Sequence, residues 1–334
     1  MKKLGAILAT LAVVLPTSAL ADKLQVVTSS TGLLYGTTYI AQQMGYFKEA
    51  SLDVSIFDGG GGSNAVASVV AGSADIGVVG IRNMAKALEQ GVQLRAIGTG
   101  LDGLDLTLVV RSDLTSGEGQ KVALPQLLSP LKGKVIAVLD IGGSSGGFVR
   151  YLFKQASLPS DFATLVNVNS NAGHLASLKG KRIDGFVNTS PVWQAAVAEG
   201  YGKALVVPSR EIPEVSGMHY IIQAVRQDTL QKRSEAIEKY LTGVYRAQLL
   251  IRRDPKAARD AFFGYLAKLT TSEPISENLR DVMWKSTDGL FPPSLELTPV
   301  GVAKARKFFA IPAAVSDESL VDNSVAKKVM GAVR

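Results

Sequence analysis

The feature that most constrains the fold is a glycine loop followed by a short helix and a buried strand, in residues 58–80. Four consecutive glycines precede Ser63 and Asn64, either of which can cap a helix start. Apolar residues at 65, 66, 69 and 70 share one helix face, and 76–79 form a short apolar strand. Such a loop presents free N–H groups that can bind an anion or a polar ligand head. The alternative is an ordinary tight turn between a strand and a helix.

Short apolar strands and helices alternate along most of the chain. One series occupies residues 24–110 and a second occupies 134–207, with the glycine-, serine- and proline-rich segment 111–130 between them. This alternation predicts a mostly parallel sheet flanked by helices in each series, so we expect an α/β protein with two lobes. A further strand follows at 219–225, and from residue 227 the pattern is helical to the end.

A second glycine loop, at residues 140–147, repeats the order of strand, aspartate, glycines, serines and helix. Ser144 and Ser145 can offer hydroxyl groups there, beside the N–H groups of the helix start. Ligands of open α/β sheets bind at the carboxyl ends of the strands. We therefore expect the two loops, with Gly61, Gly62 and Ser63 in the first, to face a shared cleft and hold one ligand.

The second loop also supports an enzymatic alternative. Residues 142–146 match the G-x-S-x-G pattern of serine hydrolases, and Asp184 and His219 follow Ser144 in the order of that triad. Against this hypothesis, the sequence contains no HGGG-type segment for an oxyanion hole. Neither loop has a nucleotide-binding motif, because both lack the G-K-[ST] ending and the G-x-G-x-x-G spacing.

Two aromatic residues and one arginine near strand ends are further candidates for the cleft. Tyr35 lies in the first strand-to-helix loop, and Trp193 lies one turn into the helix after Asn188. Either aromatic ring can stack on a ligand or pack in a core or on the surface. Arg82 is a candidate counter-charge for an anion, and a solvated arginine at a helix start is the alternative.

The two histidines are too few for a histidine metal cluster, so we expect no metal site. His174 lies at a helix start that can face the cleft, or it is a partly exposed helix residue. His219 begins the strand with which the chain leaves the second lobe, where it can line the hinge or simply pack in the sheet.

The N-terminus has the layout of a secretory signal peptide in residues 1–21. Two lysines precede an apolar run that ends at Pro16, and Ala19-Leu20-Ala21 forms a small-x-small cleavage site. We expect cleavage after Ala21 and export to the periplasm. The chain has no cysteine, which excludes disulfides, thiolate metal sites and a lipid-modified cysteine at the cleavage point. The net charge of +7 is scattered, so nucleic acid is not an expected partner.

Four segments resemble periplasmic solute-binding proteins of ABC importers, in the nitrate, sulfonate, taurine and thiamine-precursor group. They are G-L-L-Y-G-T-T-Y-I-A-Q-Q-M-G-Y-F-K-E-A-S-L-D-V at 32–54, the glycine stretch with A-G-S-A-D-I-G-V-V-G in 58–80, L-K-G-K-V-I-A-V at 131–138, and L-A-S-L-K-G-K-R-I-D-G-F-V at 175–187 with Pro191 and Trp193 behind it. Their order and spacing carry the resemblance across residues 24–210.

The resemblance implies a two-lobed periplasmic-binding-protein type II fold with a helical C-terminal segment. Lobe 1 would comprise residues 22–111 and 217–334, and lobe 2 residues 112–216. The implied function is non-catalytic: a monomer that captures a small organic anion, such as a sulfonate or carboxylate (aromatic ones included), and delivers it to the permease of the importer. A thiamine-pyrimidine precursor, bound or made by a biosynthetic relative of the same fold, is a second alternative. No cofactor is expected.

The resemblance also implies two walls of a binding site. Tyr35, Gly61, Gly62 and Ser63 would line one wall, with Arg82 near them. The other wall would be formed by Ser144, Ser145, Asn188 and His174. The segment Asn188-Thr189-Ser190 stands where many members of the family have an apolar residue and a tryptophan, so the sequence leaves the ligand open.

Overall fold

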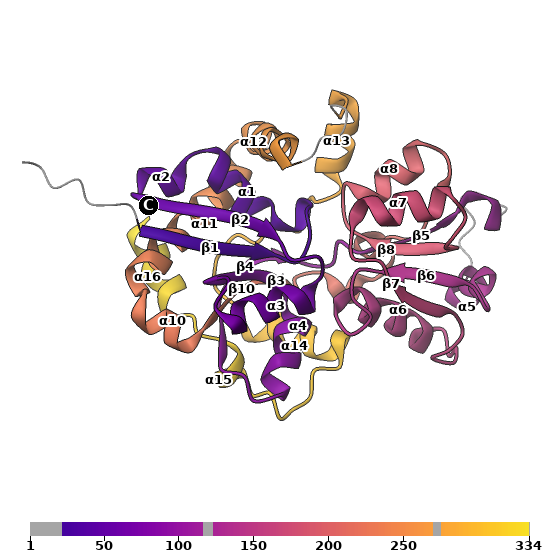
Figure 1. Cartoon of the computed structure of the whole chain (residues 1–334), viewed down its shortest axis with the longest axis horizontal. Coiled ribbons are helices and arrows are strands. Elements are labelled where there is room, and N and C mark those ends of the chain that lie inside the picture. Colours follow the sequence, from indigo (N-terminus) through magenta and orange to yellow (C-terminus); the bar gives the residue numbers. More distant parts are fainter. Residues whose placement is uncertain (1–21, 116–122, 270–274, 334) are drawn as a thin grey trace, which may run out of the picture.

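The computed structural model describes residues 22–115, 123–269 and 275–333. The expected signal peptide and its cleavage site lie outside the described residues. Within the described part, ten strands form two sheets of five, and each sheet with its helices makes one lobe (Figure 1).

The first sheet has the strand order β2-β1-β3-β10-β4. Its strands are β1 (Asp22–Thr28), β2 (Leu52–Asp58), β3 (Ile76–Gly80), β4 (Leu94–Asp102) and β10 (His219–Arg226). The second sheet has the order β7-β6-β8-β5-β9. Its strands are β5 (Thr107–Arg111), β6 (Val135–Val138), β7 (Thr164–Asn167), β8 (Gly185–Asn188) and β9 (Gly202–Val206).

The two sheets share one topology. In each, the first three strands of the βα series are parallel, and one antiparallel strand follows: β10 between β3 and β4, and β5 between β8 and β9. The central strands β3 and β8 are buried along their whole length, as expected for parallel strands covered by helices on both faces. The α/β class and the two alternating series of strands and helices predicted from the sequence are therefore confirmed.

The helices that flank the sheets lie in both lobes. In the first part of lobe 1 they are α1 (Gly36–Gln43), α2 (Tyr46–Glu49), α3 (Gly62–Ala71) and α4 (Ile81–Glu89). In lobe 2 they are α5 (Leu124–Leu128), α6 (Ser144–Gln155), α7 (Asn171–Lys179) and α8 (Val192–Ala198), followed by α9 (Pro208–Glu211). Short 3₁₀ turns occur at Leu33–Tyr35, Ser112–Leu114, Ser129–Leu131 and Pro213–Val215.

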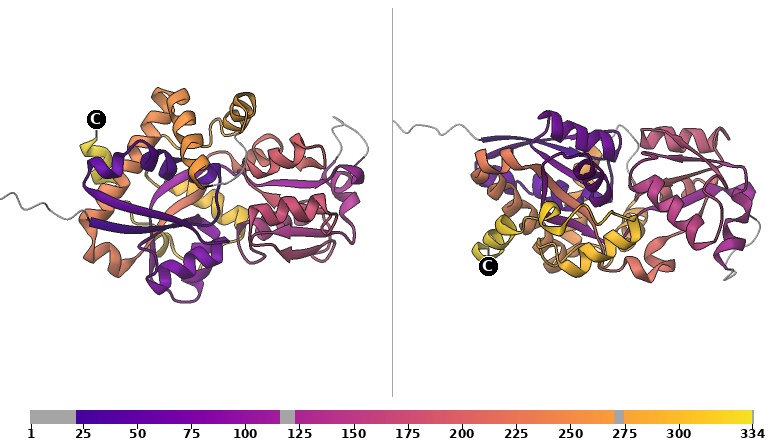
Figure 2. Two further views of the ribbon diagram at one scale, coloured as in Figure 1. Left: turned by 45° about the horizontal axis from the view of Figure 1, so that its top comes forward. Right: turned by 90° about the horizontal axis from the view of Figure 1, so that it is seen from below.

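The C-terminal segment is helical and packs mainly on lobe 1. Its helices are α10 (Gln227–Lys232), α11 (Ser234–Arg253), α12 (Pro255–Leu269), α13 (Glu277–Lys285), α14 (Pro299–Phe309), α15 (Asp317–Leu320) and α16 (Ser324–Ala332). The helical pattern expected from residue 227 onward is confirmed, and it begins with two separate helices, α10 and α11. In the right-hand view of Figure 2, the yellow C-terminal segment reaches the boundary between the lobes. Among the described residues, none of the helices is long and apolar enough to cross a membrane.

The chain crosses between the lobes twice, at residues 103–106 and 207–218. The two crossings contact each other, because the N–H of Gly103 donates to the carbonyl of Met218 at 2.6 Å. The strand Thr107–Arg111 therefore belongs to the sheet of lobe 2, although the sequence analysis placed it in lobe 1. The pattern of this strand shows that it is buried but not which sheet it joins.

Candidate functional site

A small cavity of about 40 Å³ lies between the lobes, where the carboxyl ends of the strands of both sheets meet. Residues of both lobes line it, and strand β10, which follows the second crossing, contributes two of them. The lining residues are Ser29, Ser30, Leu34, Tyr35, Gly62, Gly80, Asn83, Leu106, Leu139, Asp140, Ser144, Ser145, Asn188, Thr189, Tyr220 and Ile221.

Two helices begin at this cavity, one from each lobe. Helix α3 follows the first glycine loop, where Gly61 adopts a φ of 129° that only glycine takes without strain. Helix α6 follows the second loop and begins with Ser144 and Ser145, which both line the cavity. The first N–H groups of a helix have no acceptor inside the helix, so both ends can donate to a ligand or to another group.

The N-terminus of α3 already has such an acceptor, the carboxylate of Asp140 from the opposite lobe. One oxygen of Asp140 accepts from the N–H of Ser63 at 2.9 Å and from the side-chain amide of Asn83 at 3.0 Å. The other oxygen accepts from the N–H of Gly142 at 2.9 Å. The first glycine loop was expected to hold a ligand anion, and in this structure a carboxylate of the protein itself lies there.

Further hydrogen bonds join the two lobes around the cavity. The hydroxyl of Ser144 donates to the side-chain oxygen of Asn83 at 3.0 Å. The amide of Asn171 donates to the carbonyl of Thr31 at 2.7 Å, and the N–H of Leu33 donates to the carbonyl of Ser190 at 2.9 Å. These bonds hold the lobes in a closed arrangement, which explains why the cavity is small.

Glycines make this close approach of the lobes feasible. A Cβ atom at Gly80 of lobe 1 would lie 2.4 Å from the hydroxyl of Ser144, and one at Gly143 of lobe 2 would lie 2.4 Å from the side-chain amide nitrogen of Asn83. Both distances are far below van der Waals contact. Larger residues at these two positions would therefore collide with the Asn83–Ser144 pair.

Hydroxyl and amide groups dominate the polar lining of the cavity. Burial raises the pKa of Tyr35 to about 12, and it raises the pKa of Tyr220 well above its usual value. Both phenols are therefore neutral hydrogen-bonding groups at physiological pH. The charged residue of the lining is Asp140, and no lysine or arginine is among the lining residues.

A second carboxylate, that of Asp105, is buried in the first crossing segment beside the cavity. It accepts from the hydroxyl of Thr189 at 2.5 Å and from the N–H of Ser190 at 3.1 Å. Burial raises its pKa to about 6, against the opposing effect of these hydrogen bonds. Asp105 thus fixes the loop after β8, at the point where Asn188 and Thr189 line the cavity.

The structure brings five of the predicted site residues to the cavity: Tyr35, Gly62, Ser144, Ser145 and Asn188. Gly61 and Ser63 lie next to it but do not line it. The N–H of Gly61 donates to the carbonyl of Ser29 at 2.7 Å, and the N–H of Ser63 donates to Asp140.

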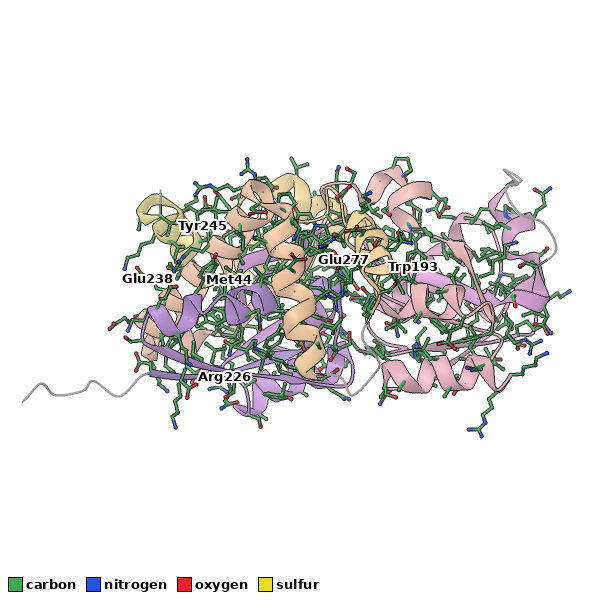
Figure 3. The ribbon with its side chains drawn as sticks, turned by 90° about the horizontal axis from the view of Figure 1, so that it is seen from above. Met44, Trp193, Arg226, Glu238, Tyr245 and Glu277 are labelled. Carbon is green, nitrogen blue, oxygen red and sulfur yellow. The ribbon has the colours of Figure 1, made fainter. Side chains whose placement is uncertain are left out.

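Two predicted residues, His174 and Trp193, lie behind the cavity wall in lobe 2. The ring nitrogen Nδ1 of His174 is 3.0 Å from the amide nitrogen of Asn188, and burial lowers the pKa of His174 to about 4. His174 therefore orients Asn188 from behind. The indole of Trp193 donates to the hydroxyl of Ser190 at 3.2 Å and packs in the core of lobe 2. Figure 3 shows Trp193 on this lobe, beside the helix that carries Glu277.

His219 and Arg82 also lie away from the cavity lining. His219 is a hinge residue, because its Nδ1 lies 2.7 Å from Asp102 and its Nε2 accepts from the N–H of Thr298 at 2.7 Å. The guanidinium of Arg82 pairs with Glu89 at 2.8 Å and lines a different hollow. Arg82 was expected to face the ligand, but its neighbour Asn83 occupies that place.

The residues of the alternative triad each bond to other groups. Ser144 donates to Asn83, and His219 is held by Asp102 and Thr298. Asp184 accepts from the N–H of Val135 at 2.9 Å and pairs with Arg111 at 3.1 Å. The order Ser…Asp…His in the sequence is therefore not a triad in space.

Six polar residues of the lining were not predicted from the sequence. Some of them are next to predicted positions. Asn83 could have been found from the sequence pattern, because it is a polar residue on the apolar face of α4, one turn before Ala87. In the structure its side chain is 4% exposed. The missed residues are Ser29, Ser30, Asn83, Asp140, Thr189 and Tyr220. Among the described residues, no group of three or more acidic or histidine side chains could hold a metal ion.

Comparison with known proteins agrees with this geometry. The chain is 26% identical over 235 residues to YtlA of Bacillus subtilis (strain 168), a match that covers 68% of this chain and 65% of YtlA. Among solved structures, one from Bordetella bronchiseptica RB50 superposes with a TM-score of 0.78 at 22% identity, covering 93% of this chain and 98% of the other.

Two further structures share the fold. The ligand-binding component of an ABC-type import system from Staphylococcus aureus, solved with zinc bound, has a TM-score of 0.71 at 13% identity, covering 92% of this chain and 99% of that one. The alkanesulfonate-binding protein SsuA from Xanthomonas axonopodis pv. citri, bound to MOPS, has a TM-score of 0.68 at 16% identity, covering 93% and 99%. The fold is therefore that of periplasmic binding proteins.

A family model described as NMT1/THI5 like matches residues 35–258, which is more than half of the chain. The matched range includes both glycine loops and every lining residue of the cavity from Tyr35 onward. On this match, the chain belongs to the NMT1/THI5-like family.

Proposed function

We propose that this protein is the exported solute-binding component of an ABC importer, which captures a small molecule between its lobes and delivers it to a membrane permease. The observation that carries this proposal is the cavity itself, whose hydrogen-bonding groups come from both lobes. A ligand that contacts both walls binds only when the lobes are closed, so it shifts the population toward the closed state. The proposal includes a periplasmic location, a monomeric state and release of the ligand unchanged.

The chemistry of the lining favours a ligand with several hydrogen-bonding groups and little negative charge. An organic anion was expected from the sequence, with Arg82 as its counter-charge. Arg82 lies outside the cavity and the carboxylate of Asp140 lies in it, where it would repel an anion. A heterocycle with amino groups, such as a pyrimidine precursor of thiamine, can donate to Asp140 and accept from the hydroxyl groups. We therefore favour that class over sulfonates and carboxylates.

A thermal-shift screen of the purified protein tests this proposal. The panel contains aminopyrimidines related to thiamine, aliphatic and aromatic sulfonates, carboxylates and nitrate. A ligand present at 100 times its Kd stabilises the folded state by about 2.7 kcal/mol, which raises Tm by several degrees. We expect an aminopyrimidine to produce this shift, and we expect Ser144→Ala to reduce it. If no solute of any class raises Tm, the binding function is contradicted.

Two further measurements address the enzymatic alternatives. A serine-reactive phosphonate should leave Ser144 unlabelled, because its hydroxyl bonds to Asn83 and no histidine lies among the residues that line the cavity. Any aminopyrimidine that binds should be recovered unchanged after incubation. Labelling of Ser144, or conversion of the ligand, would support an enzyme instead.

A further inference from the structure

A second and larger hollow, of about 640 Å³, lies at the boundary of the two lobes. Helices α4 and α14 of lobe 1, helix α6 of lobe 2 and the second crossing segment supply its walls. We refer to it as the basic groove. Its lining residues are Arg82, Gly147, Arg150, Tyr151, Lys154, Gln155, Glu214, Lys304, Lys307, Phe308, Phe309 and Ala310.

The basic groove is separate from the cavity, although the same helices line both. On α4, Arg82 faces the groove and Asn83 faces the cavity. On α6, the first turn with Ser144 lines the cavity, and the next turns with Arg150 and Lys154 line the groove. The two hollows thus share no lining residue.

Positive charge dominates the groove. It is lined by two arginines and three lysines, against the single carboxylate of Glu214. Arg82 is paired with Glu89. Within the part of the chain that the structure describes, Lys154 and Lys307 have no acidic partner within ion-pair distance, and both are exposed. The groove therefore presents uncompensated positive charge from both lobes.

Arg82 of lobe 1 and Arg150 of lobe 2 both line the groove, on opposite sides of the lobe boundary. Burial lowers the pKa of the Arg150 guanidinium, and the charge of Arg82 on the other lobe lowers it further, while Asp140 acts in the opposite direction. Like charges brought together on closure oppose that closure. An anion between Arg82 and Arg150 would remove this repulsion.

One wall of the groove is aromatic and also spans both lobes. Tyr151 of α6 stacks on Phe308 of α14, with ring centroids 4.1 Å apart and an interplanar angle of 28°. Phe309 lies behind it and stacks on Tyr220, whose ring lines the cavity, at 5.9 Å. A flat apolar group can therefore pack in the groove beside the cations.

We propose that the basic groove is a second ligand site, distinct from the cavity, which binds an amphipathic organic anion with a flat apolar body and one or two acidic groups. Cations of both lobes hold the acidic groups, and the Tyr151–Phe308 wall contacts the apolar body. Because its walls come from both lobes, an occupied groove stabilises the closed arrangement. The site goes beyond the proposed function, which concerns the cavity alone.

Naphthalene-1,5-disulfonate, a flat dianion, is the probe for this proposal. We expect isothermal titration of the full protein at about 20 mM salt to show saturable binding of one probe per chain, weakened at higher salt. The double variant Lys154→Glu/Lys307→Glu should lower the affinity at least tenfold. Both residues are exposed, so folding should be unaffected, as circular dichroism would verify.

A matched variant completes the design. Lys132→Glu reverses the charge of an exposed lysine of lobe 2 outside the groove, and it should leave the affinity for the probe unchanged. Three results would overturn the proposal: no saturable binding, an unchanged affinity in the double variant, or an equal loss of affinity in Lys132→Glu. The ligands proposed for the cavity are aminopyrimidines, whereas the groove probe is a disulfonate. Failure of the aminopyrimidines to raise Tm would therefore leave this titration unaffected, so the two proposals fail separately.

Discussion

Asp140 makes two of the side-chain hydrogen bonds that join the lobes in the closed arrangement. Its carboxylate joins the second glycine loop to the start of α3 through Ser63 and to α4 through Asn83. A hydrogen bond to a charged group contributes about 1.5–3 kcal/mol. Asp140 therefore occupies the helix end that was expected to hold a ligand.

Replacing Asp140 by alanine should open the ligand-free protein. The loss of these bonds is expected to lower the ratio of closed to open molecules by about tenfold or more. Small-angle X-ray scattering should then show a larger radius of gyration than for the wild type. An unchanged radius would mean that other contacts suffice to hold the lobes together.

Two buried titratable groups in lobe 2 and its crossing segment have opposite effects on stability. The pKa of Asp105 is raised from 3.8 to about 6, so the folded state loses stability as pH rises through this window. The pKa of His174 is lowered from 6.5 to about 4, so the folded state loses stability as pH falls through that window. Each effect amounts to about 3 kcal/mol, and the two largely cancel between pH 4 and pH 6.

Single substitutions should separate these two effects. The free energy of unfolding of Asp105→Asn should rise between pH 4 and pH 6.5, because only His174 then contributes. That of His174→Gln should fall over the same range. Urea denaturation at several pH values measures how the free energy of unfolding changes with pH in each variant. The double variant is the control, because it contains neither titratable group. Parallel slopes in the two single variants would refute the assignment.

The sequence predicted individual site residues only in part, and the reason is visible at Arg82 and Asn83. Strand order and loop position located the cavity, so Tyr35, Ser144, Ser145 and Asn188 were identified correctly as lining residues. The direction of a side chain at a helix start depends on the packing of the whole helix. Its positive charge made Arg82 the candidate for contact with an anion. In the structure, Asn83 lies on the buried face of α4, and Arg82 pairs with Glu89.

At the scale of elements, the strand–loop–helix unit explains how the two lobes meet. Each lobe brings a glycine loop and a helix N-terminus to the boundary, and glycine is required where backbone and side chains of the other lobe approach most closely. Such units follow from local patterns, so the alternation of strands and helices in both lobes could be predicted from the sequence. The sequence did not predict that β5 joins the second sheet, because pairing across the chain is not a local property.

Gly80→Ala tests the fit between the lobes. Its backbone angles suit alanine, but the new methyl group would lie 2.4 Å from the hydroxyl of Ser144. We expect the closed form to lose stability by about 1–3 kcal/mol, which scattering would show as a larger radius of gyration. Gly331→Ala should leave the radius unchanged, because a Cβ added at this helical glycine would meet no atom within 4 Å beyond the adjacent residues and the backbone of its own helix. A closed Gly80→Ala protein would contradict the close fit.

For the whole molecule, two lobes joined by two crossing segments form a hinged clamp. The crossings contact each other at Gly103 and Met218, and His219 ties the second crossing to Asp102 and Thr298. Closure leaves a cavity of about 40 Å³, little more than the space of one or two water molecules. An organic ligand therefore requires the lobes to separate before it enters, and it must hold them slightly further apart than in this structure.

The most direct test of this account is the affinity of the ligand identified by the thermal-shift screen, measured by titration calorimetry on two variants. Tyr35→Phe removes one hydroxyl from lobe 1, and Ser144→Ala removes one from lobe 2. If the ligand binds between the lobes, each variant should weaken binding at least threefold, as expected for the loss of one hydrogen bond. Unchanged affinity in both variants would contradict the assignment of the cavity as the binding site.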